Sequence, residues 1–451
     1  MKITAVAAAV LAVIVIAGVY GLRPNSLPSV FTQSSPSGGT VHTDISTEAP
    51  CMVCPHDRLT FYASGRYWVF LVDGYSEAWF TSSLDNSNWN SPTNIGAMYG
   101  TAADTTSGNL ACWYDPTTNQ VSYVRTDAST QSIYYRLGTP NSDGSITWAA
   151  AEQTALHATG NKYCWYPVIT VDSNGYPWIS YNYYTGSGGG DAYVSTSTTN
   201  NGVWTTAGGY PYKLSSGNNE YTCSLTPMAS GKIMAVYGTY SPDEILARIY
   251  DGSGTWGAES TLATDSPDNM ESSFSVVAYN SGTYCMLVYV TNEGTMKSLT
   301  YSGGSWSAAT SFSTDTQMPY TCPTTTYDPA NNKIYAFWLK DSHDPNIYSS
   351  TYDIGSGTWS ASDSVWYTDQ VNFYAYVDYP NDINSYYQTY NNVLAVAFMD
   401  TGASQYYRIR SVYQTTPTPL MNMYSLVALG AVVTVLIYLV VHFARKTRKK
   451  R

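Results

Sequence analysis

The sequence predicts an all-β chain folded as a β-propeller of about seven four-stranded blades, with six blades as the alternative. Three observations predict this ring. A module of short alternating runs recurs about every fifty residues, Gly, Asn and Asp clusters separate the runs, and the last module lacks its final strand. Abundant Tyr and Thr suit half-exposed strands, and the chain is only 12% charged. The ends add a predicted C-terminal transmembrane helix and an N-terminal signal peptide or anchor helix.

The plainest module shows the four expected strands. They are Ser275–Tyr279, Tyr284–Tyr289, Lys297–Tyr301 and a short run around Trp306. Turn residues separate them, so each module is expected to form an antiparallel meander. The tryptophan of this last strand recurs in five other modules, at Trp89, Trp148, Trp204, Trp256 and Trp359.

The seventh module ends at Tyr406–Arg410 without a tryptophan strand. We therefore expect a segment near Val41 to Ile45 to supply the missing strand and close the ring. Circular closure protects sheet edges from pairing with other chains.

Domain boundaries follow from composition. We assign 1–22 to a signal peptide or signal anchor, 23–40 to a Pro- and Gly-containing stalk and 41–414 to the propeller. A linker at 415–420, a transmembrane helix at 421–443 and a basic tail at 444–451 follow. Within the helix, Met423 to Phe443 is uncharged, and at ~1.5 Å per residue it matches a hydrocarbon core of ~30 Å.

The basic tail orients the protein in the membrane. By the positive-inside rule, Arg445 to Arg451 is cytoplasmic and the propeller extracellular. The run from Ile3 to Tyr20 is long for a signal peptide and no clear cleavage site follows it, so both cleavage and a second anchor stay open. The predicted extracellular part contains 14 Lys and Arg and 32 Asp and Glu, a net charge of about −18. This negative charge disfavours binding to nucleic acid.

Seven cysteines leave at least one unpaired within the chain. Cys51 and Cys54 form a CxxC pair, but no second pair and no suitably spaced histidine follow, which disfavours zinc. Cys164, Cys223 and Cys322 occupy similar places before the first turn of their modules, either around one end of the ring axis or simply buried on inner strands.

Three tryptophan turns resemble degenerate Asp-boxes, the Ser-x-Asp-x-Gly-x-Thr-Trp turns of sialidase-type (BNR-type) propellers. They are the segments Ser83–Trp89, Asp251–Trp256 and Asp353–Trp359. In that family the Asp-box is a structural turn between outer strands. The resemblance therefore implies that these tryptophans pack blades; stacking against sugars is the alternative.

Sialidase activity would need three arginines, a Tyr–Glu nucleophile pair and an acid/base Asp, as the resemblance implies. Arg58 alone stands where the first arginine is expected, on the first inner strand. Arg136, Arg248, Arg408 and Arg410 fall on third strands. The catalytic residues stay unknown, and the pattern leans against an enzyme.

Superposing the modules shows an acidic residue after nearly every second strand. These loops share a face with the connections between blades, where oxygen ligands could hold Ca²⁺ or a cationic ligand; hairpin preference for Asp is the alternative. Aromatic residues flank the same loops. The candidate ligand-binding residues are Arg58, Asp73, Tyr75, Asp127, Trp165, Tyr183, Tyr184, Asp243, Glu293, Asp341 and Asp400.

The sequence thus favours a membrane-anchored extracellular propeller that recognises a glycan or a surface protein at the mouth of the ring. Such a protein would act in adhesion at a cell surface or virion envelope. The alternatives are a sialidase-like surface glycoside hydrolase and a structural envelope component. No cofactor is certain, and Ca²⁺ is the one candidate.

Overall fold

A computed structural model describes residues 34–43, 55–72, 77–98, 110–127, 129–159, 162–184, 190–217, 220–239, 242–266, 273–314, 323–340, 346–360, 363–368, 383–401 and 407–417. The chain divides into two compact units, and Ser35–Thr415 forms one of them. The segments predicted as signal or anchor and as transmembrane helix lie outside the described residues. Within the described ranges, no helix is long and apolar enough to span a membrane.

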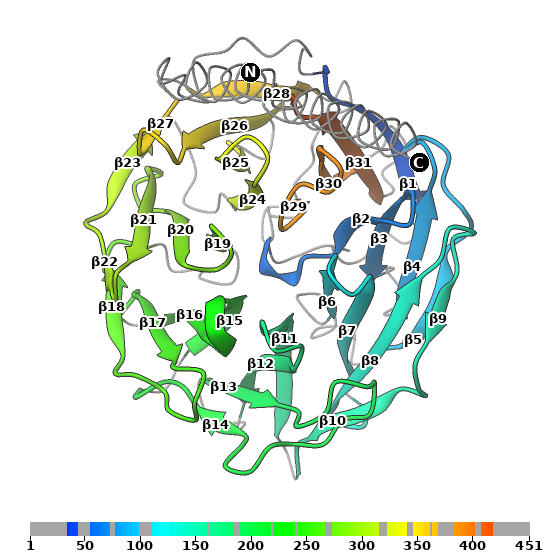
Figure 1. The fold of residues 1–451 in the computed structure, drawn as a ribbon, viewed down its shortest axis with the longest axis vertical. Helices are drawn as coiled ribbons and strands as arrows, with labels where there is room; N and C mark the ends of the chain where they lie inside the picture. The colour runs from blue at the N-terminus through cyan, green and yellow to red at the C-terminus, as the bar shows by residue number, and fades with distance from the viewer. Residues whose placement is uncertain are drawn as a thin grey trace, which may run out of the picture. The chain divides into compact units, whose positions relative to one another are not determined.

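Seven antiparallel sheets surround a common axis, which confirms the seven-blade prediction (Figure 1). The first three blades, numbered along the chain, follow one another as meanders. Blade 1 comprises β2 (Thr60–Ala63), β3 (Arg66–Val72), β4 (Glu77–Ser83) and β5 (Thr93–Ala97); blade 2 comprises β6 (Leu110–Asp115), β7 (Gln120–Asp127), β8 (Ser132–Pro140), β9 (Ile146–Trp148) and β10 (Gln153–His157); blade 3 comprises β11 (Tyr163–Val171), β12 (Pro177–Tyr184), β13 (Gly190–Thr196) and β14 (Tyr212–Lys213).

The next three blades repeat this order. Blade 4 comprises β15 (Glu220–Pro227), β16 (Ile233–Thr239), β17 (Ile245–Tyr250) and β18 (Ser260–Ala263); blade 5 comprises β19 (Phe274–Tyr279), β20 (Tyr284–Val290), β21 (Met296–Ser302), β22 (Ser305–Trp306) and β23 (Thr310–Ser313); blade 6 comprises β24 (Thr324–Asp328), β25 (Lys333–Leu339), β26 (Asn346–Asp353), β27 (Thr358–Trp359) and β28 (Ser364–Thr368). The described helices are two 3₁₀ turns, η2 (Pro55–Asp57) and η3 (Ala229–Gly231).

Blade 7 is closed by the N-terminal part of the ring, as the sequence predicts. Its strands are β29 (Ile383–Ser385), β30 (Val393–Thr401) and β31 (Tyr407–Thr415), and β1 (Ser37–Thr43) pairs antiparallel with β31. The strand begins inside the segment predicted as a stalk, because Gly38 and Gly39 pair with Val412 and Ser411. These glycines belong to the sheet rather than to a linker.

The core is divided into wedges between neighbouring blades. Each wedge packs side chains of one blade's inner strands against the next blade, for example Met234 and Val236 of blade 4 against Val276 and Leu287 of blade 5. The turn tryptophans lie at the outer end of these wedges. Trp89, Trp148, Trp204, Trp256, Trp306 and Trp359 all pack against core clusters, which supports their interpretation as packing residues.

The Asp-box-like segments form tight turns between third and fourth strands. The Asp85 carboxylate accepts hydrogen bonds from the backbone N–H groups of Ser87 and Asn88, at 2.9 and 2.8 Å. These bonds hold the pKa of Asp85 well below its usual range. Asp251 accepts equivalent bonds from Ser253 and Thr255. The acids of these turns are thus committed to their own backbone.

Candidate functional site

The predicted ligand-binding residues fall into three groups in the structure. Asp73, Tyr75 and Asp341 lie outside the described residues, as does the side chain of Asp400, whose backbone pairs with Arg408 in blade 7. Arg58 lies at the centre of the ring. The remaining described candidates lie at the ends of second strands or beside them, in blades 2 to 5.

Arg58 is not on the first inner strand, where the sequence predicted it, but precedes β2 and follows η2. Its φ of 53° is left-handed, and η2 contacts β6, β11, β19, β24 and β29, five of the seven innermost strands (Figure 1). The guanidinium donates to the carbonyl oxygens of Val276 and Thr325, both at 2.7 Å, and lies 5.1 Å from the ring centre of Tyr387. The guanidinium N–H groups therefore donate to the backbone of neighbouring blades.

Electrostatics support the same assignment for the ring centre. Burial lowers the pKa of Arg58 to about 10, an effect that Tyr387 and Tyr390 oppose. Burial and the nearby Arg58 together lower the pKa of His56 to about 3. We call the segment Pro55–Arg58, with this buried imidazole and carbonyl-bound guanidinium, the plug of the ring axis.

Five of the other described arginines contact residues of the second to fourth strands or of the turns. These contacts are Arg66 with Ser82, Arg125 with Glu152, Arg136 with the ring of Trp148, Arg248 with Tyr212 and Arg410 with Tyr367. The three-arginine cluster that the sialidase resemblance implies gains no support from these positions.

The acids after the second strands belong to separate blades. Asp127 ends β7 and accepts bonds from the backbone and hydroxyl of Ser129 at 2.9 and 2.6 Å, which closes its own turn. Glu293 is exposed between β20 and β21, and the Asp243 carbonyl accepts from Ser266. Among the residues that the structure describes, no three His, Cys, Asp or Glu side chains form a group that could hold a metal ion.

The structure does bring the blade 3 aromatics together. Trp165 stacks on Tyr184 with ring centres 5.0 Å apart and on Tyr163 at 5.6 Å. Tyr183 belongs to the opposite face of the sheet, packs on Tyr193 and carries Lys162 at 5.4 Å from its ring. These rings are half-buried and much of their surface is used against one another.

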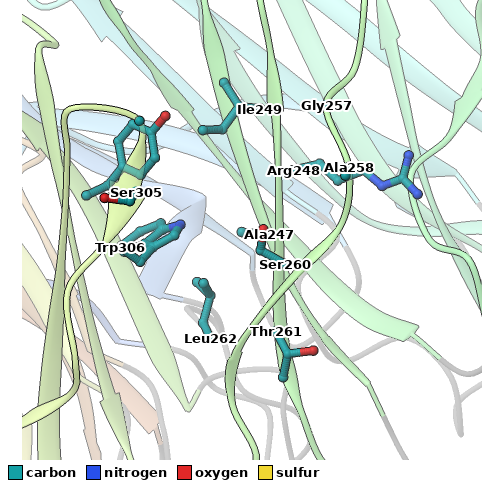
Figure 2. Close-up of a pocket in the computed structure, with 12 residues that line it drawn as sticks. Ala247, Arg248, Ile249, Gly257, Ala258, Ser260, Thr261, Leu262, Ser305 and Trp306 are labelled. Carbon is teal, nitrogen blue, oxygen red and sulfur yellow. The ribbon is translucent and has the colours of Figure 1, made fainter.

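A pocket that the sequence did not predict lies between blades 4 and 5. Its volume is about 370 Å³, which falls within the ~300–1,000 Å³ of small-molecule sites. Figure 2 shows Trp306, Ile249 and Leu262 directed into the same space. Tyr301 adds a second ring 5.4 Å from Trp306. Hydroxyl groups lie at the edges, from Ser260, Thr261 and Ser305.

The pocket carries no charge directed at a ligand. Figure 2 shows that the guanidinium of Arg248 extends away from Trp306. It donates to Tyr212 of blade 3 at 3.3 Å and lies 4.0 Å from the Glu259 carboxylate. Burial opposes ionisation of Glu259, but hydrogen bonds from Ser216 and Tyr237 outweigh it and lower its pKa. The local charges are therefore paired behind the pocket wall.

Sequence reasoning missed this pocket for a physical reason. Its two walls come from different modules, β17 and β18 on one side and β21 and β22 on the other. The recurring tryptophan was visible in the sequence, but each module's tryptophan looks like the others when the modules are considered one at a time. A comparison of what each tryptophan faces in the preceding module could have found the difference.

Several solved structures share this fold at low sequence identity to the chain. The polysaccharide lyase Uly1 aligns with a TM-score of 0.52 at 10% identity over 86% of this chain and 100% of that chain. A PL25 ulvan lyase aligns with a TM-score of 0.56 at 9% identity, over 84% of this chain and 95% of that chain. The BP39L lectin from Burkholderia pseudomallei aligns with a TM-score of 0.57 at 11% identity, over 82% of this chain and 98% of that chain. No protein-family model and no curated protein sequence matches the chain. These likenesses show the fold alone.

Proposed function

We propose that the ring is a carbohydrate-recognition module that binds a neutral saccharide residue between blades 4 and 5. The observation that carries this proposal is the pocket itself, with an aromatic wall, aliphatic flanks and hydroxyl groups at its edge. The lectin and the two lyases that share the fold bear carbohydrate-related names, which supports a carbohydrate ligand in preference to another small molecule.

Sugar chemistry fits these walls. The C–H face of a pyranose is apolar and packs against an aromatic ring such as Trp306, while its hydroxyls pair with short polar side chains such as Ser260 and Ser305. An acidic sugar would find no cation in the pocket, because Arg248 is engaged with Tyr212 and Glu259. The ligand is therefore neutral.

The site of recognition in this proposal is the outer rim rather than the mouth of the ring. The turn Pro55–Asp57 contacts five of the innermost strands, and Asp127 at the mouth closes its own turn. Ca²⁺ at the remaining acidic loops stays a prediction. The proposal also includes an extracellular ring held at a membrane by residues 421–443, which rests on the hydropathy and basic tail of the sequence.

A glycan array probed with the full-length protein in detergent tests the function. Trp306→Ala should weaken binding to retained neutral glycans at least about tenfold, since truncating a central aromatic of a site costs ~2 kcal/mol or more. Trp89→Ala is the matched control, because Trp89 holds the same turn position in blade 1. Equal binding by both variants, or retention of acidic glycans alone, would contradict the proposal. The same array run with a chelator tests separately whether glycan binding depends on Ca²⁺.

A further inference from the structure

The interface between blades 5 and 6 has the same frame as the pocket between blades 4 and 5. In blade 4, Ala247 pairs with Ser260, and a register shift sets Leu262 beside the next pairing. In blade 5, Ser298 pairs with Thr310 and the same shift sets Phe312 at the equivalent position. Structural position therefore equates Ala247 with Ser298 and Leu262 with Phe312.

The tryptophans of the following blades are equivalent in the same way. Trp306 pairs with Tyr301 in blade 5, and Trp359 pairs with Tyr352 in blade 6. Each tryptophan faces the outer strand of the blade before it. The two interfaces thus present the same aromatic wall to two different sets of opposing residues.

The blade 5–6 interface is filled. Phe312 stacks on Trp359 with ring centres 3.9 Å apart and planes at 13°, and the Trp359 Nε1–H donates to Ser298 Oγ at 2.9 Å. Both the face and the N–H of this indole are therefore used within the protein. At the blade 3–4 interface, Tyr212 lies parallel to Trp256 with ring centres 6.0 Å apart and planes at 15°.

At the blade 4–5 interface both contacts are missing. Leu262 lacks the ring that would cover Trp306, and Ala247 lacks the hydroxyl that would accept from its indole. No residue in the described part of the chain accepts a hydrogen bond from Trp306 Nε1. Figure 2 shows this nitrogen on the side of the ring nearest Ala247. A half-buried indole ring and its N–H, unpaired among the described residues, therefore both border the pocket.

We propose that Ala247 and Leu262 are the residues that make this interface a binding site, and that the Trp306 Nε1–H orients the ligand by donating to one of its hydroxyl oxygens. The blade 5–6 interface is a closed copy of the same site, occupied by Phe312 and Ser298. This inference rests on the proposed function. It adds which residues open the pocket and which donor selects the ligand.

The first test needs no ligand and follows indole N–H exchange with water by NMR in full-length, detergent-solubilised protein. In the wild type, the Trp306 N–H should exchange at least about tenfold faster than the Trp359 N–H, since only the latter is hydrogen-bonded internally. The double variant Leu262→Phe, Ala247→Ser should slow the exchange of the Trp306 N–H with water. The double variant Phe312→Leu, Ser298→Ala should accelerate the exchange of the Trp359 N–H. Equal exchange of the two indoles in the wild type would overturn the inference.

The second test titrates a panel of neutral methyl hexopyranosides and follows the same indole signals. The wild type should show one responding indole, Trp306, and the Leu262→Phe, Ala247→Ser variant should lose at least tenfold in affinity while keeping its melting temperature. The Phe312→Leu, Ser298→Ala variant should gain a second responding indole, Trp359. Its failure to gain one, with an unchanged melting temperature, would refute the closed-copy assignment.

The outcomes separate the two proposals. If Trp306 exchanges rapidly but no glycan shifts its signal, the carbohydrate function fails and the open pocket stands. If glycans bind through Trp306 and the Leu262→Phe, Ala247→Ser variant binds as well as the wild type, the function stands and the assignment of the opening residues fails.

Discussion

Single residues at the ring axis form hydrogen bonds with several different blades. Arg58 donates to blades 5 and 6, and its carbonyl oxygen accepts from Cys112 of blade 2 at 3.0 Å. The next residue, Leu59, donates to Asn384 of blade 7 and accepts from Phe70 of blade 1. The sequence placed Arg58 on the first inner strand, whereas it precedes that strand. These contacts could not be predicted because the partners lie up to 325 residues away and no local pattern marks them.

His56 gives this plug a pH dependence. Its ring is buried, stacks on Phe274 at 5.4 Å, and has its pKa lowered to about 3, first by burial and then by Arg58. Between pH about 3 and 6.5 the unfolded chain binds a proton that the folded protein does not, so acid favours unfolding by ~1.4 kcal/mol per pH unit. His56→Phe should remove this contribution. Urea unfolding at pH 6.5 and 4.5 should show the variant gaining roughly 2–3 kcal/mol relative to wild type.

His157→Phe is the control for this measurement, because His157 is exposed and its Nδ1 meets Ser132 Oγ at 3.0 Å. The gain of His56→Phe between the two pH values should exceed any gain of this exposed control. Parallel curves for His56→Phe and wild type would show that the buried imidazole is not the source of the acid sensitivity.

At the scale of elements, local patterns predicted the strands and turns but not how the fourth strands are built. Alternating runs and Gly or Asn turns gave the second and third strands of each blade. In blades 2, 5 and 6 the outermost position is shared by two short strands that pair with the same third strand, for example β22 and β23 with β21. A register shift also interrupts the pairing of β18 with β17 and of β23 with β21. Strands β17, β18, β21 and β22 line the pocket together, so the pattern of one module does not mark it.

Strand β1 offers a test of how tightly the ring is closed. A Cβ at Gly38 would lie 1.9 Å from the backbone oxygen of Ser411, so the strand fits against β31 only with glycine there. Gly38→Ala should lower the free energy of unfolding by about 2 kcal/mol or more, because backbone on both sides must shift. Gly208→Ala is the control, since its Cβ would meet nothing within 4 Å. Equal urea midpoints for the two variants would contradict this closure geometry.

At the scale of the whole molecule, seven similar modules produce an asymmetric ring. Circular repetition was visible in the sequence, and so was the missing last strand of the seventh module, because both depend on spacing. The site depends on differences between copies: Leu262 stands where blade 5 has Phe312, and Ala247 where it has Ser298. Such differences change no local propensity, so a module-by-module analysis treats them as equivalent apolar or small residues.

Because β1 closes the ring, its removal is expected to change both the melting temperature and the oligomeric state of the protein. Without Ser37–Thr43, β31 presents an unpaired edge, and unpaired edges associate with other chains. Fragments 34–417 and 44–417 differ only in residues 34–43, which contain this strand. The first should be monomeric with a single unfolding transition. The second should melt roughly 5 °C or more lower and form oligomers in size-exclusion chromatography with light scattering, because several kcal/mol of pairing are lost. Monomers of equal melting temperature would show that the three chain-terminal strands hold blade 7 without the N-terminal strand.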